Sequence, residues 1–381
     1  MLHYGVPGVS VAVFEDGKIK WAKGYGTARS NGNVPVTETT LFQAASISKS
    51  VTAIGVLRLV QDGAIDLDQD VNSYLTSWRV PSSAFTKNRD VTLRGLLNHT
   101  AGITVHGFPG YAQDAPVPTL VEVLNGEEPA NTERIEVDTP IGETWRYSGG
   151  GYTIIQQLLI DVSRQSFQQY MAENILYPLG MTSSTFELRL DELQEAGIAW
   201  GYRPGLCPVV SGYHIYPESA AAGLWTTATD IALFAIGVHE SAVGSPNSVI
   251  NKALANEMLA SQKGNYGFGV MVSGEGRSHR FRHTGINQGF DSMYVAYSEL
   301  GTGAVVMTNS NLSSGLIREI IDSVAREYDW PDYPIREQRV SSPFSEDQLE
   351  NLPGTYEIEE GFDVSVIREG VSFPVNDTIQ K

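Results

Sequence analysis

Cysteine is almost missing from this sequence, and long apolar runs and positive charge are scarce. The 381 residues include one cysteine, Cys207, so no internal disulfide can form. One cysteine and seven scattered histidines, with no HExxH pattern, argue against a zinc site. We therefore expect no metal, and we assign no cofactor.

Basic residues are outnumbered by acidic ones. The 26 lysines and arginines stand against 44 aspartates and glutamates, which gives a net charge of −18. This charge disfavours nucleic acids and anionic membranes as partners. No run of about 18 uncharged apolar residues occurs, so we expect no membrane span. Because the opening residues contain no basic segment or cleavage site, any export signal would lie upstream. The compartment is therefore left open between periplasmic or extracellular and cytoplasmic.

The hydrophobic pattern indicates strands at both ends of the chain and helices between them. A hairpin is predicted over Gly8–Gly26, followed by a buried helix that ends at Gly63. The other clear elements are helices at Tyr152–Arg164, Ser166–Met181 and 314–328, and strands at 266–274, 279–285, 290–298 and 301–311. This order predicts an α/β (α+β) fold. We divide it into an α/β domain of residues 1–63 and 225–343, an inserted, mainly helical domain of residues 64–224, and the start of a C-terminal β extension at 344–381.

A lysine at the start of the first helix is the first chemical signal. From Ile47 to Val60 apolar residues occupy nearly every face, which predicts a buried helix. Ser46 and Lys49 are three residues apart and should face the same space. Burial and the positive helix N-terminus both lower the pKa of a lysine. A neutral amine beside a serine hydroxyl is a general base, and backbone N–H groups there can stabilise an oxyanion.

The same pair has a plainer interpretation. Ser46 can be a helix cap while Lys49 extends its amine to water. Of the eight lysines only Lys49 follows a serine at this spacing, but S-x-x-K by itself is a weak pattern. This motif alone therefore does not decide between the two interpretations.

Two later stretches favour the catalytic interpretation. PIGETWRYSGGGYTIIQQ places Tyr147 in a loop before a helix, and SHRFRHTGINQGF places His283, Thr284 and Gly285 at a strand end. A serine, a lysine, a tyrosine and a strand-borne H/K-T-G, in this order, resemble the penicillin-recognising serine hydrolases. The sequence is most similar to the branch that holds class C β-lactamases, D-aminopeptidases, actinomycete-type D-alanyl-D-alanine carboxypeptidases and family VIII carboxylesterases. LLNHTAGI, YPLGM and AAAGLWTTATDIALF are similar to further segments of that family.

The resemblance implies a β-lactamase/penicillin-binding-protein-like fold, in which an antiparallel sheet flanked by helices carries an inserted all-helical domain. It also implies that Ser46 is the acylated nucleophile and Lys49 its partner. Tyr147 would share base duty with Lys49 and protonate the leaving group. A packing role is the plainer alternative for Tyr147.

The resemblance also assigns groups to the substrate cleft. The N–H groups of Ser46 and Ile286 would form the oxyanion hole. His283, Thr284 and Gly285 would line one wall, although His283 could instead be a half-buried strand histidine. Gly149 stands where the family has a substrate-binding asparagine.

Two departures from the family pattern argue against efficient β-lactam hydrolysis. The usual Y-x-N reads Tyr147-Ser148-Gly149, so the asparagine is replaced and the three glycines Gly149–Gly151 should leave a roomy, mobile backbone. His283 replaces a lysine, so a permanent positive charge is lost. If His283 binds a substrate carboxylate, only its protonated form, below about pH 6.5, should do so.

These residues predict a serine hydrolase that acts through an acyl-enzyme on a small-molecule or peptide substrate. Peptides or amides, including D-residue-containing ones, are preferred over esters by a small margin, because such relatives often carry an appended C-terminal barrel. A short-chain carboxylesterase with weak or no β-lactamase activity is the alternative. A penicillin-acylated binder or sensor with little turnover is a second alternative. The oligomeric state is left open.

Overall fold

The computed structural model describes residues 1–30, 33–246, 248–311, 313–335 and three short strands beyond them. Residues 1–335 form one compact unit and residues 336–381 a second, and each is described here by itself. None of the helices in the described part of the chain is long and apolar enough to cross a membrane.

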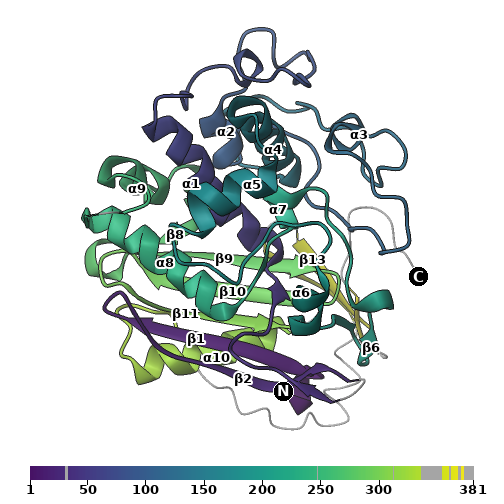
Figure 1. Ribbon diagram of the computed structural model, residues 1–381, viewed down its shortest axis with the longest axis vertical. Coiled ribbons are helices and arrows are strands. Elements are labelled where there is room, and N and C mark those ends of the chain that lie inside the picture. Colours follow the sequence, from purple (N-terminus) through teal and green to yellow (C-terminus); the bar gives the residue numbers. More distant parts are fainter. Residues whose placement is uncertain are drawn as a thin grey trace. The chain divides into compact units, whose positions relative to one another are not determined.

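Among the described residues, seven strands form one antiparallel sheet in the first unit, in the order β3-β2-β1-β11-β10-β9-β8. The strands are β1 (Gly8–Glu15), β2 (Lys18–Arg29), β3 (Val34–Pro35), β8 (Met271–Ser273), β9 (Arg280–Asn287), β10 (Phe290–Tyr297) and β11 (Thr302–Thr308). β1 pairs with β11, so strands from the two ends of the sequence lie side by side at the centre of the sheet (Figure 1). The predicted hairpin and the antiparallel sheet are confirmed.

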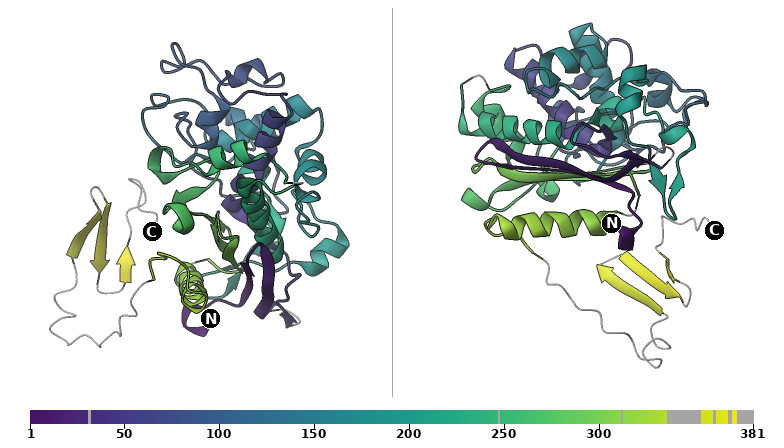
Figure 2. Two further views of the ribbon diagram at one scale, coloured as in Figure 1. Left: turned by 90° about the vertical axis from the view of Figure 1, so that its left-hand side faces the viewer. Right: turned by 60° about the horizontal axis from the view of Figure 1, so that its bottom comes forward.

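The two faces of the sheet are buried under different helices. Side chains alternate across a strand, so Val9, Val11 and Val13 of β1 join the cluster of α10 (Ser314–Glu327). Ala12 and Phe14 point the other way, into the cluster that includes α8 (Ala228–Val243). Figure 2 shows the sheet between these two helices, with the yellow-green α10 on one side of it. The three central strands β1, β10 and β11 therefore bury both faces, as their nearly continuous apolar sequences require, whereas β2 and β3 stay largely exposed.

Helices and long loops make up the middle of the chain, as predicted. Its helices, with those that flank it, are α1 (Ser48–Gln61), α2 (Leu93–Leu97), α3 (Leu120–Asn125), α4 (Gly149–Ser163), α5 (Phe167–Met171), α6 (Glu192–Gly197), α7 (Ser219–Ala222) and α9 (Lys252–Leu259). Two short strand pairs add β4 (Phe42–Gln43) with β7 (Trp225–Thr226) and β5 (Tyr202–Arg203) with β6 (Cys207–Pro208). The division of this unit into an α/β part and an inserted part of residues 64–224 stays a proposal.

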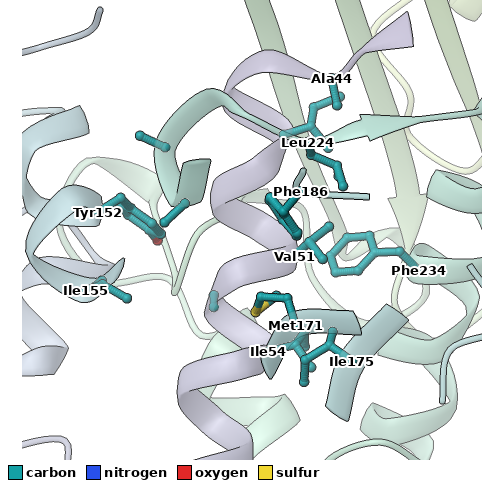
Figure 3. Close-up of a cluster of buried hydrophobic side chains, with 14 of the residues drawn as sticks. Ala44, Val51, Ile54, Tyr152, Ile155, Met171, Ile175, Phe186, Leu224 and Phe234 are labelled. Atoms are coloured by element: carbon teal, nitrogen blue, oxygen red, sulfur yellow. The ribbon is translucent and has the colours of Figure 1, made fainter. Parts of the chain in front are cut away.

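Helix α1 lies at the centre of the larger core. Its residues from Ser48 to Leu57 are all buried. Figure 3 shows Val51 and Ile54 among side chains from α5, from the turn that follows α5, and from α8, including Met171 and Phe234. A buried helix of this kind fixes the position of whatever its first turn carries.

Two predicted elements differ in the structure. The helix predicted over Ser166–Met181 is α5 only as far as Met171, and a π-helical turn, Ala172–Leu176, follows it. The strand predicted over 266–274 shrinks to β8, because Gly269 has a φ of +71°, which is not an extended conformation and interrupts the strand.

The second unit contains three antiparallel strands, β12 (Gly354–Glu359), β13 (Phe362–Ile367) and β14 (Gly370–Ser372). This agrees with the β pattern predicted near the end of the sequence. The predicted boundary between residues 343 and 344 lies outside the described residues.

Candidate active site

Ser46 and Lys49 lie together at the start of α1. Ser46 is in the 3₁₀ turn Ala45–Ile47 that leads into the helix. The Lys49 amine is 3.0 Å from Ser46 Oγ and donates to the carbonyl oxygen of Ala221 at 2.9 Å. Lys49 is 2% exposed, and burial lowers its pKa to about 7. The alternative in which this lysine extends to water is therefore wrong.

The turn that carries Ser46 has a strained backbone, which hydrogen bonds of the Ser48 hydroxyl hold in place. Ala45 has a φ of +50°, a left-handed conformation that residues with a Cβ rarely adopt. The Ser48 hydroxyl donates to the Ala45 carbonyl at 2.6 Å and accepts the Leu224 N–H at 3.0 Å. These two bonds hold the turn in place, so Ser46 is presented on a rigid support.

Tyr147 lies beside the same pair. It directly precedes Ser148, whose hydroxyl caps α4. The Lys49 amine is 4.9 Å from the centre of the Tyr147 ring. Burial raises the pKa of Tyr147, and a hydrogen bond with Ser46 lowers it by a smaller amount. The three predicted catalytic residues therefore meet in one place, although Tyr147 is distant in sequence from Ser46 and Lys49.

Gly285 allows strand β9 to lie against the turn that carries Ser46. A Cβ on Gly285 would be 2.1 Å from the carbonyl oxygen of Ala44. Ser292 on the neighbouring strand donates to the same oxygen at 3.1 Å. A residue without a side chain is required here, because real Cβ atoms do not approach a backbone oxygen so closely.

The strand then turns alternate residues to opposite sides. His283, Gly285 and Asn287 are buried, whereas Thr284 and Ile286 are exposed, Ile286 to 68%. Ile286 lines a cavity of about 330 Å³. Its other lining residues are Phe108, Pro109, Tyr216, Asn287, Gln288, Asp291, Asn311 and Ser314. This cavity lies next to the predicted oxyanion residue and carries no lysine or arginine among the lining residues that the structure describes.

The surroundings of His283 disfavour its predicted role as a charged carboxylate anchor. Its Nδ1 donates to the Thr284 carbonyl at 2.6 Å, so its Nε2 accepts the Tyr266 hydroxyl proton at 2.8 Å. Burial, with Lys49 nearby, lowers the pKa of His283 to about 3. Both ring nitrogens therefore have partners within the protein, and the lowered pKa favours the neutral ring.

The surroundings of Gly149 are also different from those predicted. It is the first residue of α4, and a Cβ there would be 2.8 Å from the Phe108 ring. On Gly150 a Cβ would be 2.7 Å from the Thr104 carbonyl oxygen. The glycines allow tight packing and do not leave a roomy backbone. Gly149 therefore offers no side-chain substitute for the asparagine.

A shell of aromatic rings around Tyr147 was not predicted. The His99 ring centre is 4.4 Å from that of Tyr147 and 4.8 Å from that of Tyr266. Tyr152 lies 5.6 Å from His99, and Trp145 is 6.2 Å from it. The sequence contained a signal in LLNHTAGI, which includes His99 but indicated no role for it. Among the described residues, no three His, Cys, Asp or Glu side chains group so as to hold a metal ion.

Residues 1–324 match the family described as Beta-lactamase. The chain belongs to this family. Protein flp of Staphylococcus aureus (strain N315) is 25% identical over 312 residues, which are 80% of this chain and 60% of that protein. A beta-lactamase of Yersinia enterocolitica is 29% identical over 274 residues, 71% of this chain and 64% of the relative. The chain thus spans less than two thirds of the length of these curated relatives.

Solved structures confirm the fold. An octameric penicillin-binding protein homologue from Pyrococcus abyssi has a TM-score of 0.73 and 24% identity, over 97% of this chain and 84% of that one. The D-amino acid amidase from Ochrobactrum anthropi SV3 has a TM-score of 0.69 and 22% identity, over 86% and 95% of the two chains. The predicted family resemblance is confirmed.

The contact at Gly285 predicts the effect of a single methyl group. In Gly285→Ala the new Cβ must push β9 away from Ala44, which displaces Ile286 relative to Ser46. We expect kcat/KM for an activated ester to fall about 100-fold, since a displacement of about 1 Å can have this effect. Gly197→Ala is the matched control, because a Cβ there meets nothing within 4 Å. Equal activity of the two variants would contradict the predicted approach of β9.

The lowered pKa of Lys49 predicts an acid limit of activity. A general base must be neutral, so kcat/KM should fall about tenfold per pH unit below the pKa of about 7 and level off above it. Lys49→Arg should be inactive across the range, because a guanidinium stays charged. Glu218 is also buried, and its pKa is raised to about 8, so it titrates in a pH range close to that of Lys49. Disappearance of the acid limit in Glu218→Gln would assign it to that carboxyl and not to Lys49.

The neutral state of His283 predicts that the preference between acidic and neutral substrates does not change with pH. The ratio of kcat/KM for matched acidic and neutral substrates should stay flat between about pH 5.5 and 8, because a histidine with a pKa of about 3 does not titrate there. Taking a ratio cancels the common titration of Lys49. A ratio that rises towards low pH would restore His283 as a carboxylate anchor.

Proposed function

We propose that this protein is a serine hydrolase that cleaves its substrate through an acyl-enzyme on Ser46. The observation that carries the proposal is the contact between a buried amine, whose pKa is lowered to about 7, and a serine hydroxyl, Lys49 Nζ to Ser46 Oγ at 3.0 Å. A serine hydroxyl is a weak nucleophile until a neighbouring base accepts its proton. Lys49 can serve as this base while its own N–H donates to Ala221.

The first half of the reaction follows from these positions. Lys49 accepts the Ser46 proton as Oγ bonds to the substrate carbonyl carbon, and the carbonyl electron pair moves onto its oxygen. The N–H groups of Ser46 and Ile286 would stabilise that oxyanion. Tyr147 stays protonated at neutral pH, because burial raises the pKa of its phenol. It then gives its proton to the leaving group as the bond breaks, and the proton held by Lys49 replenishes it.

The second half releases the acyl group. Water takes the place of the leaving group and attacks the ester carbonyl of acylated Ser46. The same base accepts the water proton, and Ser46 Oγ departs with a proton returned from the Lys49–Tyr147 pair. Each half therefore uses one base and one acid, and the pair ends in its starting state.

Amides and peptides, D-residue-containing ones among them, are the substrate class that we favour. The cavity beside Ile286 includes the side-chain amide of Gln288, which can form hydrogen bonds to a peptide-like chain, whereas the amides of Asn287 and Asn311 are bonded to other protein groups. It brings the carboxylate of Asp291 and no basic side chain among its described lining residues, which disfavours substrates with a carboxylate at this position. The structural similarity to a D-amino acid amidase is in line with this class.

A short-chain carboxylesterase is the second candidate. His283 is neutral where the family pattern has a cationic lysine. A site without this positive charge suits small neutral acyl groups as well as it suits amides. Three substrates separate the candidates: a p-nitrophenyl ester series, a panel of D-amino-acid p-nitroanilides and a fluorescent penicillin. Amide turnover supports our choice, ester turnover alone supports the esterase, and a lasting label without turnover identifies a penicillin-acylated binder.

Ser46→Ala tests the mechanism itself. The change removes the attacking oxygen, so hydrolysis of every substrate in the panel should fall to background while the thermal midpoint stays close to that of the wild type. Mass spectrometry after a fluorophosphonate should find one adduct, on the wild-type peptide that contains Ser46. Ser10→Ala, at a buried serine on β1, is the matched control and should keep the adduct on Ser46. Labelling of a different serine would refute the proposal.

A further inference from the structure

His99 holds the backbone on both sides of Tyr147. Its carbonyl oxygen accepts the Arg146 N–H at 2.9 Å, and its ring Nδ1 accepts the Ser148 N–H at 3.2 Å. One residue therefore binds the peptide groups before and after the tyrosine. Because a backbone N–H can only donate, Nδ1 must be unprotonated, and the ring carries its proton on Nε2.

The ring of His99 also limits where the tyrosine ring can lie. His99 is 2% exposed, and its ring centre is 4.4 Å from that of Tyr147 at an interplanar angle of 43°. Tyr266 packs against the imidazole at 4.8 Å. The Tyr147 ring cannot turn in that direction without displacing a packed group, so both its backbone and its ring are held.

The backbone of His99 is itself in an unusual conformation. Its φ is +63°, directly after the end of α2 and its cap residue Asn98. Non-glycine residues in this region are uncommon, and histidine and asparagine are among those that adopt it more readily. The left-handed turn brings both acceptors of His99, the carbonyl and the ring, towards the loop that carries Tyr147.

Burial also keeps the imidazole in the state that this role requires. It lowers the pKa of His99 well below the usual value, and Lys49, His283 and His106 nearby act in the same direction. A protonated ring could not accept the Ser148 N–H. The hydrogen bond is therefore present at every pH at which the enzyme would work.

We propose that His99 is a positioning residue that fixes Tyr147 in the orientation from which it protonates the leaving group. This inference rests on the proposed function, in which Tyr147 supplies that proton. His99 does not touch the reacting atoms. Its effect should therefore pass entirely through Tyr147.

The dependence of kcat on the leaving group separates a positioning role from a general structural role. A general structural role would lower kcat equally for all leaving groups. A p-nitrophenolate departs without a proton, whereas the alkoxide of an ethyl ester needs one. His99→Phe keeps an aromatic ring but removes the Nδ1 acceptor. We expect kcat for the ethyl ester to fall about 30-fold and kcat for the p-nitrophenyl ester of the same acid to fall about threefold, with KM little changed. Equal losses on the two esters would overturn the proposal.

Two further variants make the test independent of whether His99→Phe folds. His99→Asn retains a side-chain acceptor and tolerates a positive φ, so it should keep kcat within about threefold of wild type on both esters. A loss as large as that of Tyr147→Phe would contradict the role of the acceptor. In the Tyr147→Phe background, His99→Asn and His99→Phe should each add almost nothing, because residues that act as one unit are not additive. A full additional loss there would show a separate role and overturn the inference.

Failure of this inference is distinguishable from failure of the proposed function. If His99→Phe has wild-type kinetics while wild-type Ser46 is labelled by a fluorophosphonate, only the positioning role is wrong. If wild-type Ser46 is not labelled, the acyl-enzyme mechanism is wrong, and with it the role of Tyr147 that His99 serves.

Discussion

A lysine buried without a charged partner is the constraint on which the site depends. The amine of Lys49 is bonded to a hydroxyl and to a carbonyl, neither of which carries a charge. An ammonium held in this way has lost its water without gaining an anion, so the neutral form is favoured. The first turn of α1, the carbonyl of α7 and the apolar core around the helix must all be in place for this to hold.

Much of the remaining architecture keeps backbone close to that amine. The strained Ala45 is held by Ser48, and Gly285 lets β9 lie against the same turn. Strand β9 belongs to the sheet that is completed by β1 from the other end of the chain. Ser46 and the predicted oxyanion residue Ile286 are thus placed by elements far apart in sequence. The small site therefore depends on the assembly of the whole sheet.

Local patterns were sufficient to predict some of this and insufficient for the rest. The approach of Ser46 to Lys49 follows from a spacing of three residues on one helix, and the hairpin of β1 and β2 follows from alternation around a turn. The order of motifs along the chain then indicated Tyr147. The state of His283 could not be predicted in this way, since it depends on the Tyr266 hydroxyl. Likewise, the tight packing of Gly149 depends on Phe108, and no pattern within its own helix reveals that contact.

One physical cause sets both halves of the proposed proton transfer. Removal from water disfavours whichever form of a group is charged. For an amine the charged form is the protonated one, so burial lowers the pKa of Lys49; for a phenol it is the deprotonated one, so burial raises that of Tyr147. The same dry environment therefore yields a base that is partly unprotonated and an acid that is intact, side by side at neutral pH. An acyl-transfer site needs this pair, and an orientation held by His99 would direct the acid to the departing atom.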